Sequence, residues 1–382
     1  MHYLDYAATT PVLPEVRDIM LDVLEQDFGN PSSVHGFGRR ARQLVEDARD
    51  RVAAAIGASP AEIVFTGGGT EAANLAIKGA AEKLRGNGNH LVVSTFEHHC
   101  VLDSAEWLEK KGFEVTRLPV EPDGIIDPNK LADVVRPSTI LVSIMSVNNE
   151  VGTIQDLVRL TEAVKAKNKN TLFHTDAVQA LGKIPVDVHA WGVDLASFAA
   201  HKLGGPKGTG ALFVRAHTPV EPVIHGGGQE HGLRSGTLNV AGIAGFGIAA
   251  EIAAKEVYEK SEELLKLRTR LLDGINANVK DVVVNGSLEQ RVAGNLNVGI
   301  NGADGETLLL LLDGAGIACS SGSACQSGAL DPSHVLLALG VDRYVAEGSL
   351  RFSLGRDSNE QDVDALLEVL PDVVDRARKV AS

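Results

Sequence analysis

The sequence lacks the features of secreted, disulfide-bonded and membrane-spanning proteins. It has only three cysteines among 382 residues. A number this low and odd does not read as a disulfide framework, so we expect a reducing compartment, the cytoplasm, in which a thiol can stay reactive. The longest leucine run, Leu308–Leu312, is far shorter than the roughly 20 apolar residues that cross a bilayer. The N-terminus, MHYLDYAATTP, has no basic segment followed by an apolar one, so neither a membrane anchor nor a secretory signal is expected.

Positive charge is also scarce. The chain has 36 Lys and Arg against 50 Asp and Glu, a net charge of −14. An acidic chain is repelled by phosphate backbones, so direct nucleic-acid binding is not expected. The hydrophobic content of 44% and the charged content of 23% are those of an ordinary globular protein. Its length is enough for two or three domains with a large core.

Strand-like and helical segments alternate over the first two thirds of the chain. The strand-like segments are short and apolar, and the segments between them follow a helical pattern. The predicted strands are 63–66, 90–95, 139–147, 171–175, 195–198 and 210–214, and the predicted helices are 71–84, 101–111 and 156–167. This alternation is typical of a mostly parallel sheet that helices cover on both faces.

The pattern changes after Thr237. Residues 240 to about 277 are rich in Ala, Leu, Glu and Lys and predict a long helix, continuous or broken. The later segments are shorter, with predicted strands at 281–284, 295–300 and 350–354 and predicted helices at 306–312, 333–339 and 361–379. We interpret this part as a smaller α+β domain.

A glycine-rich segment, TGGGTEAANLAIKG, spans 66–79 between a predicted strand and a helix that starts near Thr70. The free N–H groups at a helix start favour a phosphate, and glycines let the backbone approach it closely. The segment matches neither the dinucleotide-binding pattern nor the P-loop. A tight turn capped by a threonine is the alternative.

Two further motifs place chemically useful side chains at strand ends. Asp176 ends a predicted strand, where open α/β sheets bind ligands, and its carboxylate can hold a ring nitrogen protonated. A helix or turn cap is the other reading of Asp176. His201 and Lys202 end another strand before a glycine-rich loop, and a partly desolvated lysine can react with an aldehyde. Lys207 is a rival for that role, and either lysine could simply lie on the surface.

The cysteines differ in their surroundings. Cys325 lies in a Ser/Gly-rich stretch that cannot pack into a core, so it is expected in an accessible loop, where a nucleophile is useful. Cys319 closes an apolar run, and Cys100 also fits a small buried hydrophobe better. The sequence His98-His99-Cys100 could suggest a metal site, but adjacent histidines point in different directions and no CxxC accompanies them, so no metal is expected.

These motifs occur together and in an order that resembles one family, the cysteine desulfurases. They are fold type I (aspartate-aminotransferase-like) pyridoxal-phosphate enzymes. The resemblance covers nearly the whole chain. It rests on LDYAATTP (4–11), FGNPSSVH (28–35), FEHHCVLD, VNNEVGT, HTDAVQ, the HK and GPKG pair, HGGGQEHGLRSGT, SSGSAC and RFSLGR. The SSGSAC stretch resembles the long-loop type that serves iron–sulfur cluster assembly and nitrogen fixation.

The resemblance implies an α/β fold with two domains. A large domain at 15–258 would bind pyridoxal 5′-phosphate, and residues 1–14 and 259–382 would form a small domain with a nucleophile loop at about 318–334. It also implies a homodimer that uses L-cysteine as substrate and passes sulfur to an acceptor protein such as an iron–sulfur scaffold. The sequence does not name that acceptor.

The resemblance further assigns a role to each matching residue. Lys202 would bind the cofactor aldehyde covalently and Asp176 would pair with the ring nitrogen. His98 would stack on the ring, and Gln179 would bond to the phenolic oxygen. The phosphate would be held by Thr70, His201 and Thr237 of the partner subunit. Asn149 and Arg351 would bind the substrate carboxylate, and Cys325 would attack the substrate sulfur.

The sequence departs from the family pattern in three places. Ala199 stands where a phosphate-binding serine is usual, which removes a hydroxyl contact worth about 0.5–1.5 kcal/mol. Gln326 replaces a common threonine, with little expected effect. The chain stops at Ser382, so a longer tail that docks a scaffold in relatives is expected to be absent.

Three other functions compete with this one. An aminotransferase or selenocysteine lyase would share the cofactor. A hydrolase is suggested by the His225-Gly-Gly-Gly motif, but the chain has no GxSxG nucleophile elbow. A non-catalytic scaffold would have no need for Lys202, Asp176 and Cys325.

Overall fold

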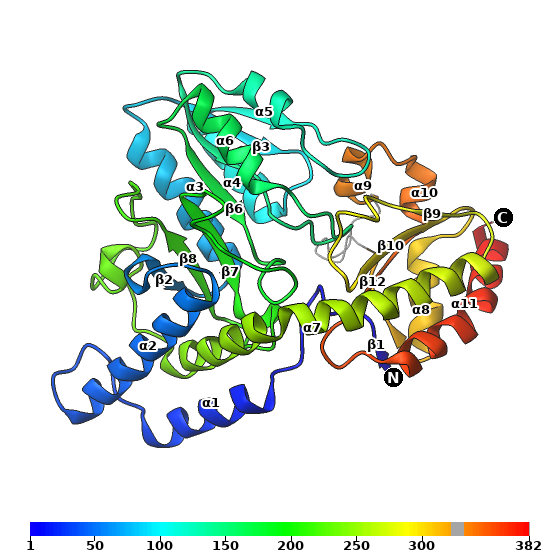
Figure 1. The fold of residues 1–382 in the computed structure, drawn as a ribbon, viewed down its shortest axis with the longest axis horizontal. Helices are drawn as coiled ribbons and strands as arrows, with labels where there is room; N and C mark the ends of the chain where they lie inside the picture. The colour runs from blue at the N-terminus through cyan, green and yellow to red at the C-terminus, as the bar shows by residue number, and fades with distance from the viewer. Residues whose placement is uncertain (322–331, 382) are drawn as a thin grey trace.

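The computed structural model describes residues 1–321 and 332–381, which contain a large seven-stranded sheet, a small three-stranded sheet and a separate two-stranded pair. Figure 1 shows the large sheet packed among helices on one side of the molecule and the small sheet on the other. The large sheet has the order β2-β8-β7-β6-β5-β3-β4. Its strands are Ile63–Thr66 (β2), His90–Ser94 (β3), Glu114–Leu118 (β4), Thr139–Ser143 (β5), Leu172–Asp176 (β6), Leu195–Ala199 (β7) and Gly210–Val214 (β8).

The large sheet is mostly parallel, as predicted. Only β8 runs against its two neighbours, β2 and β7, among the described strands. The helices around this sheet are Pro14–Gln26 (α1), Gly36–Ala55 (α2), Gly69–Leu84 (α3), His99–Glu109 (α4), Pro128–Val134 (α5), Leu157–Lys167 (α6) and the first part of Val240–Asn278 (α7). Short 3₁₀ turns are Pro60–Glu62 (η1), Ala200–Lys202 (η2) and Glu230–Gly232 (η3).

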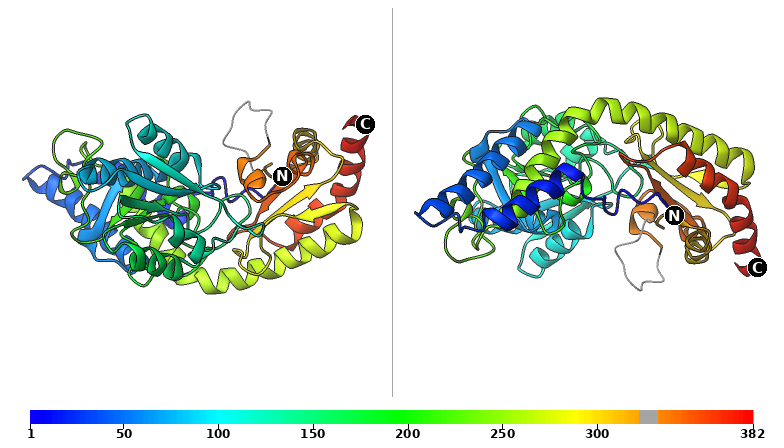
Figure 2. Two further views of the ribbon diagram at one scale, coloured as in Figure 1. Left: turned by 90° about the horizontal axis from the view of Figure 1, so that it is seen from above. Right: turned by 90° about the horizontal axis from the view of Figure 1, so that it is seen from below.

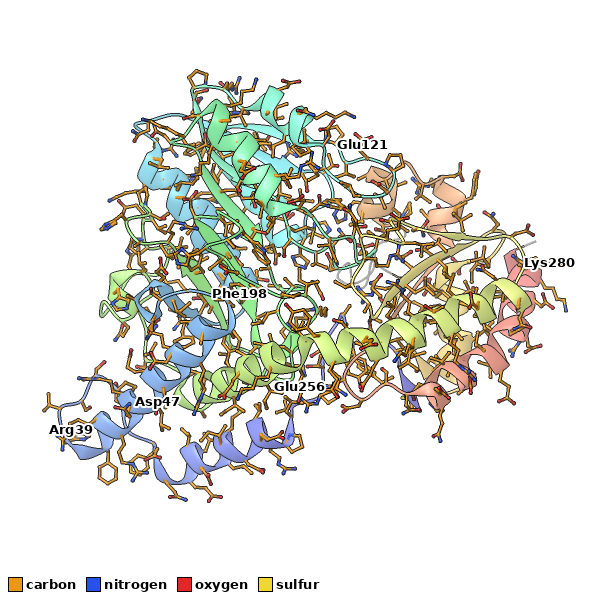
Figure 3. The ribbon with its side chains drawn as sticks, viewed as in Figure 1. Arg39, Asp47, Glu121, Phe198, Glu256 and Lys280 are labelled. Atoms are coloured by element: carbon orange, nitrogen blue, oxygen red, sulfur yellow. The ribbon has the colours of Figure 1, made fainter. Side chains whose placement is uncertain are left out.

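Both faces of the large sheet are buried. Because side chains alternate along a strand, Leu91 and Val93 of β3 pack in the apolar cluster that holds α3 and α4. Val92, between them, packs in the cluster that holds residues of α2, α6 and α7. Phe198 of β7, labelled in Figure 3, is fully buried in this second cluster. Burial on both faces explains why these strands are continuous apolar runs in the sequence.

A second core surrounds the small sheet. This sheet is antiparallel, with the order β12-β10-β9. Its elements and their neighbours are His2–Tyr3 (β1), Val282–Val284 (β9), Asn295–Ile300 (β10), Ile317–Ala318 (β11), Ser349–Ser353 (β12), Gly305–Gly314 (α8), His334–Ala338 (α9), Arg343–Glu347 (α10) and Glu360–Ala381 (α11). Leu4 packs in this core, and β1 pairs with β11, so the N-terminus lies against the C-terminal part of the chain.

Helix α7 joins the two parts. Its 39 residues form one continuous helix, so the break that the sequence left open does not occur. Both views of Figure 2 show α7 running along the large sheet and on beside the small one. The predicted domain boundary at residue 258 falls inside α7, and the division into 15–258 against 1–14 and 259–382 stays a prediction.

The prediction of a strand over 139–147 was too long. The ladder of β5 ends at Ser143, although Ile144, Met145 and Val147 remain buried. Apolar character therefore continues past the end of the strand, where the chain turns toward the functional site. Within the described part of the chain, no helix is both long and apolar enough to cross a membrane.

Candidate active site

A cavity of about 750 Å³ opens at the carboxyl ends of the parallel strands, between the large sheet and the N-terminal segment. Polar side chains reach it from the ends of β6 and β7, from the start of α4 and from β12 of the small sheet. Eight of the nine predicted site residues that the structure describes line it: Thr70, His98, Asn149, Asp176, Gln179, His201, Lys202 and Arg351. The structure thus brings together side chains that lie up to 281 positions apart in the sequence.

Asp176 is the buried acid of this cavity. It is the last residue of β6 and is 5% exposed. Its Oδ1 accepts a hydrogen bond from the Val178 amide at 3.0 Å. Burial raises the pKa of Asp176, while His98 and Lys202 oppose that shift. A carboxylate held in so dry a place is stabilised by a cationic partner, which a protonated ring nitrogen supplies.

The glycine-rich segment forms one wall of the cavity. Gly68, just before α3, has a φ of +152°, a conformation that favours glycine. A Cβ on Gly69 would lie 2.6 Å from Val178 Cγ2, so a side chain would not fit there. It would also lie 3.4 Å from the Ala199 methyl group, so the missing serine hydroxyl would have faced this turn. The start of α3 therefore offers a cradle for a phosphate, with one hydroxyl fewer than the family pattern.

Lys202 lies beside the N-terminal segment. Its Nζ donates to the carbonyl oxygens of Ala7 and Ala8, each at 2.7 Å. The preceding residue, His201, contacts Thr9 Oγ1 through Nδ1 at 3.2 Å. Burial, aided by nearby Lys202, lowers the pKa of His201 to about 4, so this ring is neutral at pH 7. A neutral imidazole can still donate one N–H to an anion.

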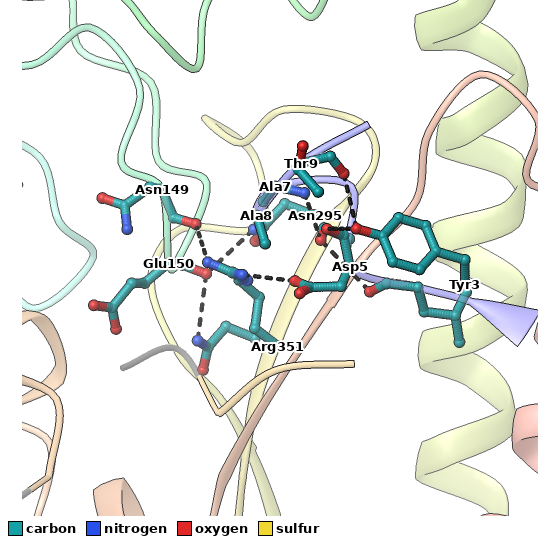
Figure 4. Close-up of polar contacts among 12 residues, drawn as sticks. Tyr3, Asp5, Ala7, Ala8, Thr9, Asn149, Glu150, Asn295 and Arg351 are labelled. Atoms are coloured by element: carbon teal, nitrogen blue, oxygen red, sulfur yellow. Dashed lines mark hydrogen bonds and ion pairs between the residues drawn. The ribbon is translucent and has the colours of Figure 1, made fainter. Parts of the chain in front are cut away.

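Arg351 reaches the cavity from β12 (Figure 4). It is 3% exposed, and its Nη2 pairs with Asp5 Oδ1 at 2.7 Å. Its Nη1 donates to the Asn149 carbonyl at 2.9 Å. Arg351 Nε and Asn149 Oδ1 are buried without a hydrogen-bond partner among the described residues. Unpaired buried polar atoms are costly, and here they mark a place where a polar ligand group fits.

Cys100 lies closer to the site than the sequence indicated. It packs against the apolar cluster of α3 and α4, as expected of a structural cysteine, but it also lines the cavity. Its Sγ lies 3.8 Å from Asp176 Oδ2, in donor geometry. Burial raises the pKa of the Cys100 thiol well above its usual range, so it stays protonated. Ligand-type atoms of His98, Cys100 and Asp176 lie within 4.8 Å of one another, an arrangement that adjacency in the sequence does not reveal.

Comparison with known proteins places the chain in a family. The model of the class V aminotransferases (Aminotransferase class-V) matches residues 2–366. The chain belongs to this family. It is 47% identical over 379 residues to the cysteine desulfurase IscS of Dictyoglomus turgidum, with 99% of this chain and 96% of the relative covered. It is equally 47% identical over 379 residues to the IscS of Methanosarcina thermophila, with 99% and 93% covered.

Solved structures agree with this assignment. A NifS-like protein superimposes with a TM-score of 0.93 at 41% identity, covering 98% of this chain and 100% of that one. The protein SspA, in complex with cysteine, gives a TM-score of 0.82 at 37% identity over 93% of this chain and 99% of that one. The predicted fold type and family are confirmed, and with them the pyridoxal-phosphate dependence and cysteine desulfurase activity of the class.

Of the predicted site residues that the structure describes, only Thr237 does not line the cavity of this desulfurase chain. Thr237 is exposed, and its role at the phosphate of a partner subunit stays a prediction. Cys325 lies outside the described residues, so its predicted role as nucleophile rests on the sequence alone. Cys319 packs against the second core, and burial raises its thiol pKa to about 12, which agrees with a structural role.

Proposed function

We propose that this chain removes the sulfur of L-cysteine, releases L-alanine and holds the sulfur as a persulfide on Cys325. The observation that carries the proposal is the meeting of Lys202, Asp176 and Arg351 at one cavity, beside the glycine turn that begins α3. Together these groups can bind the aldehyde, the ring nitrogen and the phosphate of pyridoxal phosphate, and a substrate carboxylate. The cysteine bound in the related SspA structure supports the choice of substrate.

The residues divide the work of binding the cofactor. Lys202 would hold the aldehyde, Asp176 the ring nitrogen and Gln179 the phenolic oxygen. His98 would stack on the ring, while Thr70, the neutral His201 and the start of α3 would hold the phosphate. When bound, the cofactor supplies an electron sink for the substrate's α-carbon.

Proton movement at the α-carbon would be the second task of Lys202. Released from the aldehyde by the substrate, the Lys202 amine would lie beside the reacting carbon, where it could take a proton and return it. Asp176 would keep the ring nitrogen charged. The backbone carbonyls of Ala7 and Ala8 offer this amine a fixed resting position.

Cys325 would perform the sulfur step. Its thiolate attacks the substrate Sγ, so an S–S bond forms while the Cβ–Sγ bond breaks and its electron pair stays on carbon. Protons then complete the methyl group of alanine, and the sulfur remains on Cys325. Only a few per cent of an ordinary thiol is ionised at pH 7, so a nearby base is expected to assist.

Turnover with L-cysteine tests this function. The pyridoxal-phosphate-loaded protein, incubated with L-cysteine and a thiol reductant, should release alanine and sulfide in equal amounts. L-Serine, which has no transferable sulfur, serves as the control substrate. Formation of 3-mercaptopyruvate in place of alanine would show an aminotransferase, and pyruvate would show a β-eliminating lyase. Either product would overturn the proposal.

The substrate carboxylate should depend on Arg351. In an Arg351→Lys variant the planar fork is replaced by a point charge, and we expect the KM for L-cysteine to rise by roughly 10–100-fold, equivalent to about 1.5–3 kcal/mol of charged hydrogen bonding. Arg356→Lys is a matched control, because Arg356 pairs with Glu256 outside the large cavity. Equal KM values in the wild type, Arg351→Lys and Arg356→Lys would show that Arg351 does not bind the substrate carboxylate.

The wider setting is also proposed. We infer a homodimer, because the family resemblance gives Thr237 a role in the partner's site and Thr237 does not line the cavity of its own chain. We also infer a reducing, cytoplasmic compartment, because the two described cysteines are free. Its sulfur acceptor would be a protein such as an iron–sulfur scaffold, a proposal that rests on the SSGSAC motif and the IscS relatives.

A further inference from the structure

A second lysine lies behind the wall of the active-site cavity. Lys183 follows β6 by seven positions and does not line the large cavity. Its Nζ donates a hydrogen bond to Oε1 of Gln179, which does line it. Lys183 instead borders two smaller cavities, of about 100 and 30 Å³. It can therefore influence the site only through its neighbour or through its charge.

The contact with Lys183 decides which way the Gln179 amide points. An ammonium group has three donors and no acceptor, so it selects the oxygen of an amide, and the neutral amine keeps two N–H donors for the same contact. The Gln179 NH₂ group must then lie on the other side, where its Nε2 donates to the Ala7 carbonyl at 2.9 Å. An amide NH₂ carries two hydrogens, so one donor remains for a group inside the cavity.

The charge of Lys183 acts in the same direction. Burial is the main cause that lowers its pKa, to about 7, and nearby Lys202 and Arg351 lower it further. These two cations are the charged groups whose fields reach it. An anionic oxygen on the cavity side of Gln179 would be stabilised by the amide donor and, below about pH 7, where Lys183 is protonated, also by the positive charge behind it.

We propose that Lys183 is a positioning residue that holds the Gln179 amide with its NH₂ group toward the phenolic oxygen of the cofactor. This inference rests on the proposed function, which assigns the phenolic oxygen to Gln179. Stabilising the phenolate weakens its hold on the proton of the Lys202 nitrogen that carries the cofactor. Lys183 thereby favours loss of that proton, and the unprotonated nitrogen can then accept a proton from the incoming substrate ammonium group, which leaves the substrate amine free to attack.

The pH titration of the cofactor's visible absorbance tests this role in the loaded protein. The Lys183→Met variant loses the charge of Lys183, and its Gln179 amide is free to flip. The midpoint of the absorbance titration, which reports the proton on the Lys202 nitrogen, should therefore move up by about one pH unit. The Lys183→Arg variant keeps a donor and a positive charge, so its titration midpoint should stay closer to that of the wild type. Lys260→Met is a matched control, because Lys260 borders the same 100 Å³ cavity but pairs with Glu263.

A double variant separates an effect through Gln179 from a general loss of charge. Gln179→Leu should raise the midpoint by itself, and adding Lys183→Met should then have a smaller effect than in the wild type. An unchanged midpoint in Lys183→Met, or two fully additive shifts, would overturn the inference. If the wild-type protein shows no cofactor band at all, the proposed function fails and the inference fails with it.

Discussion

Replacing Lys202 with alanine should abolish the covalent attachment of the cofactor and reduce alanine formation by about 10⁴-fold, because one side chain serves as both the anchor and the acid–base group at the α-carbon. Attachment is measured by borohydride reduction followed by mass spectrometry of the peptide. Alanine release is measured in the same preparations. Asp176 and the glycine cradle remain in the variant, so non-covalent cofactor binding should persist.

Lys207→Ala is the control for this experiment. Lys207 lies five residues farther along the chain, is exposed and does not line the cavity. The sequence left it as a rival for the covalent role, and the structure favours Lys202 because the Lys202 side chain borders the cavity. A reduced cofactor found on Lys207, or a Lys202→Ala variant with full activity, would reverse this assignment.

Replacing Cys325 with alanine should leave cofactor binding unchanged and lower alanine and sulfide formation together, by roughly 10³-fold or more. The loss falls on one step, the attack on the substrate sulfur, so L-cysteine should still change the cofactor absorbance. Cys319→Ala is the matched control, since that thiol packs in the second core and stays protonated. A Cys325→Ala variant that still makes both products at the wild-type rate would leave Cys325 without a role.

The sequence predicted the fold and part of the cavity from local rules, and the remaining cavity residues, such as His98, Asn149 and Gln179, only through the family resemblance. Strands buried on both faces give continuous apolar runs, which is why the predicted strands 63–66, 210–214 and 295–300 match the observed bounds. Strand ends carry the ligands in such sheets, which made Asp176 and Lys202 recognisable. The order of motifs then identified the family, which the comparisons confirm.

Contacts between distant segments were beyond sequence reasoning. The proximity of Cys100 to Asp176 depends on how the start of α4 meets the end of β6. The pairing of Arg351 with Asp5 joins β12 to the N-terminal segment over 346 positions. Nothing in the sequence singled out Lys183, and only the contact with Gln179 connects it to the site. No spacing or periodicity in the sequence encodes these pairs.

The most direct test of the account is to follow the sulfur in a single turnover. The loaded protein receives less than one equivalent of L-cysteine without reductant, and alanine and the masses of the three cysteine peptides are measured. We predict one added sulfur atom on the Cys325 peptide for each alanine released, and none on the Cys100 or Cys319 peptides. Alanine released without a persulfide on Cys325 would contradict the account.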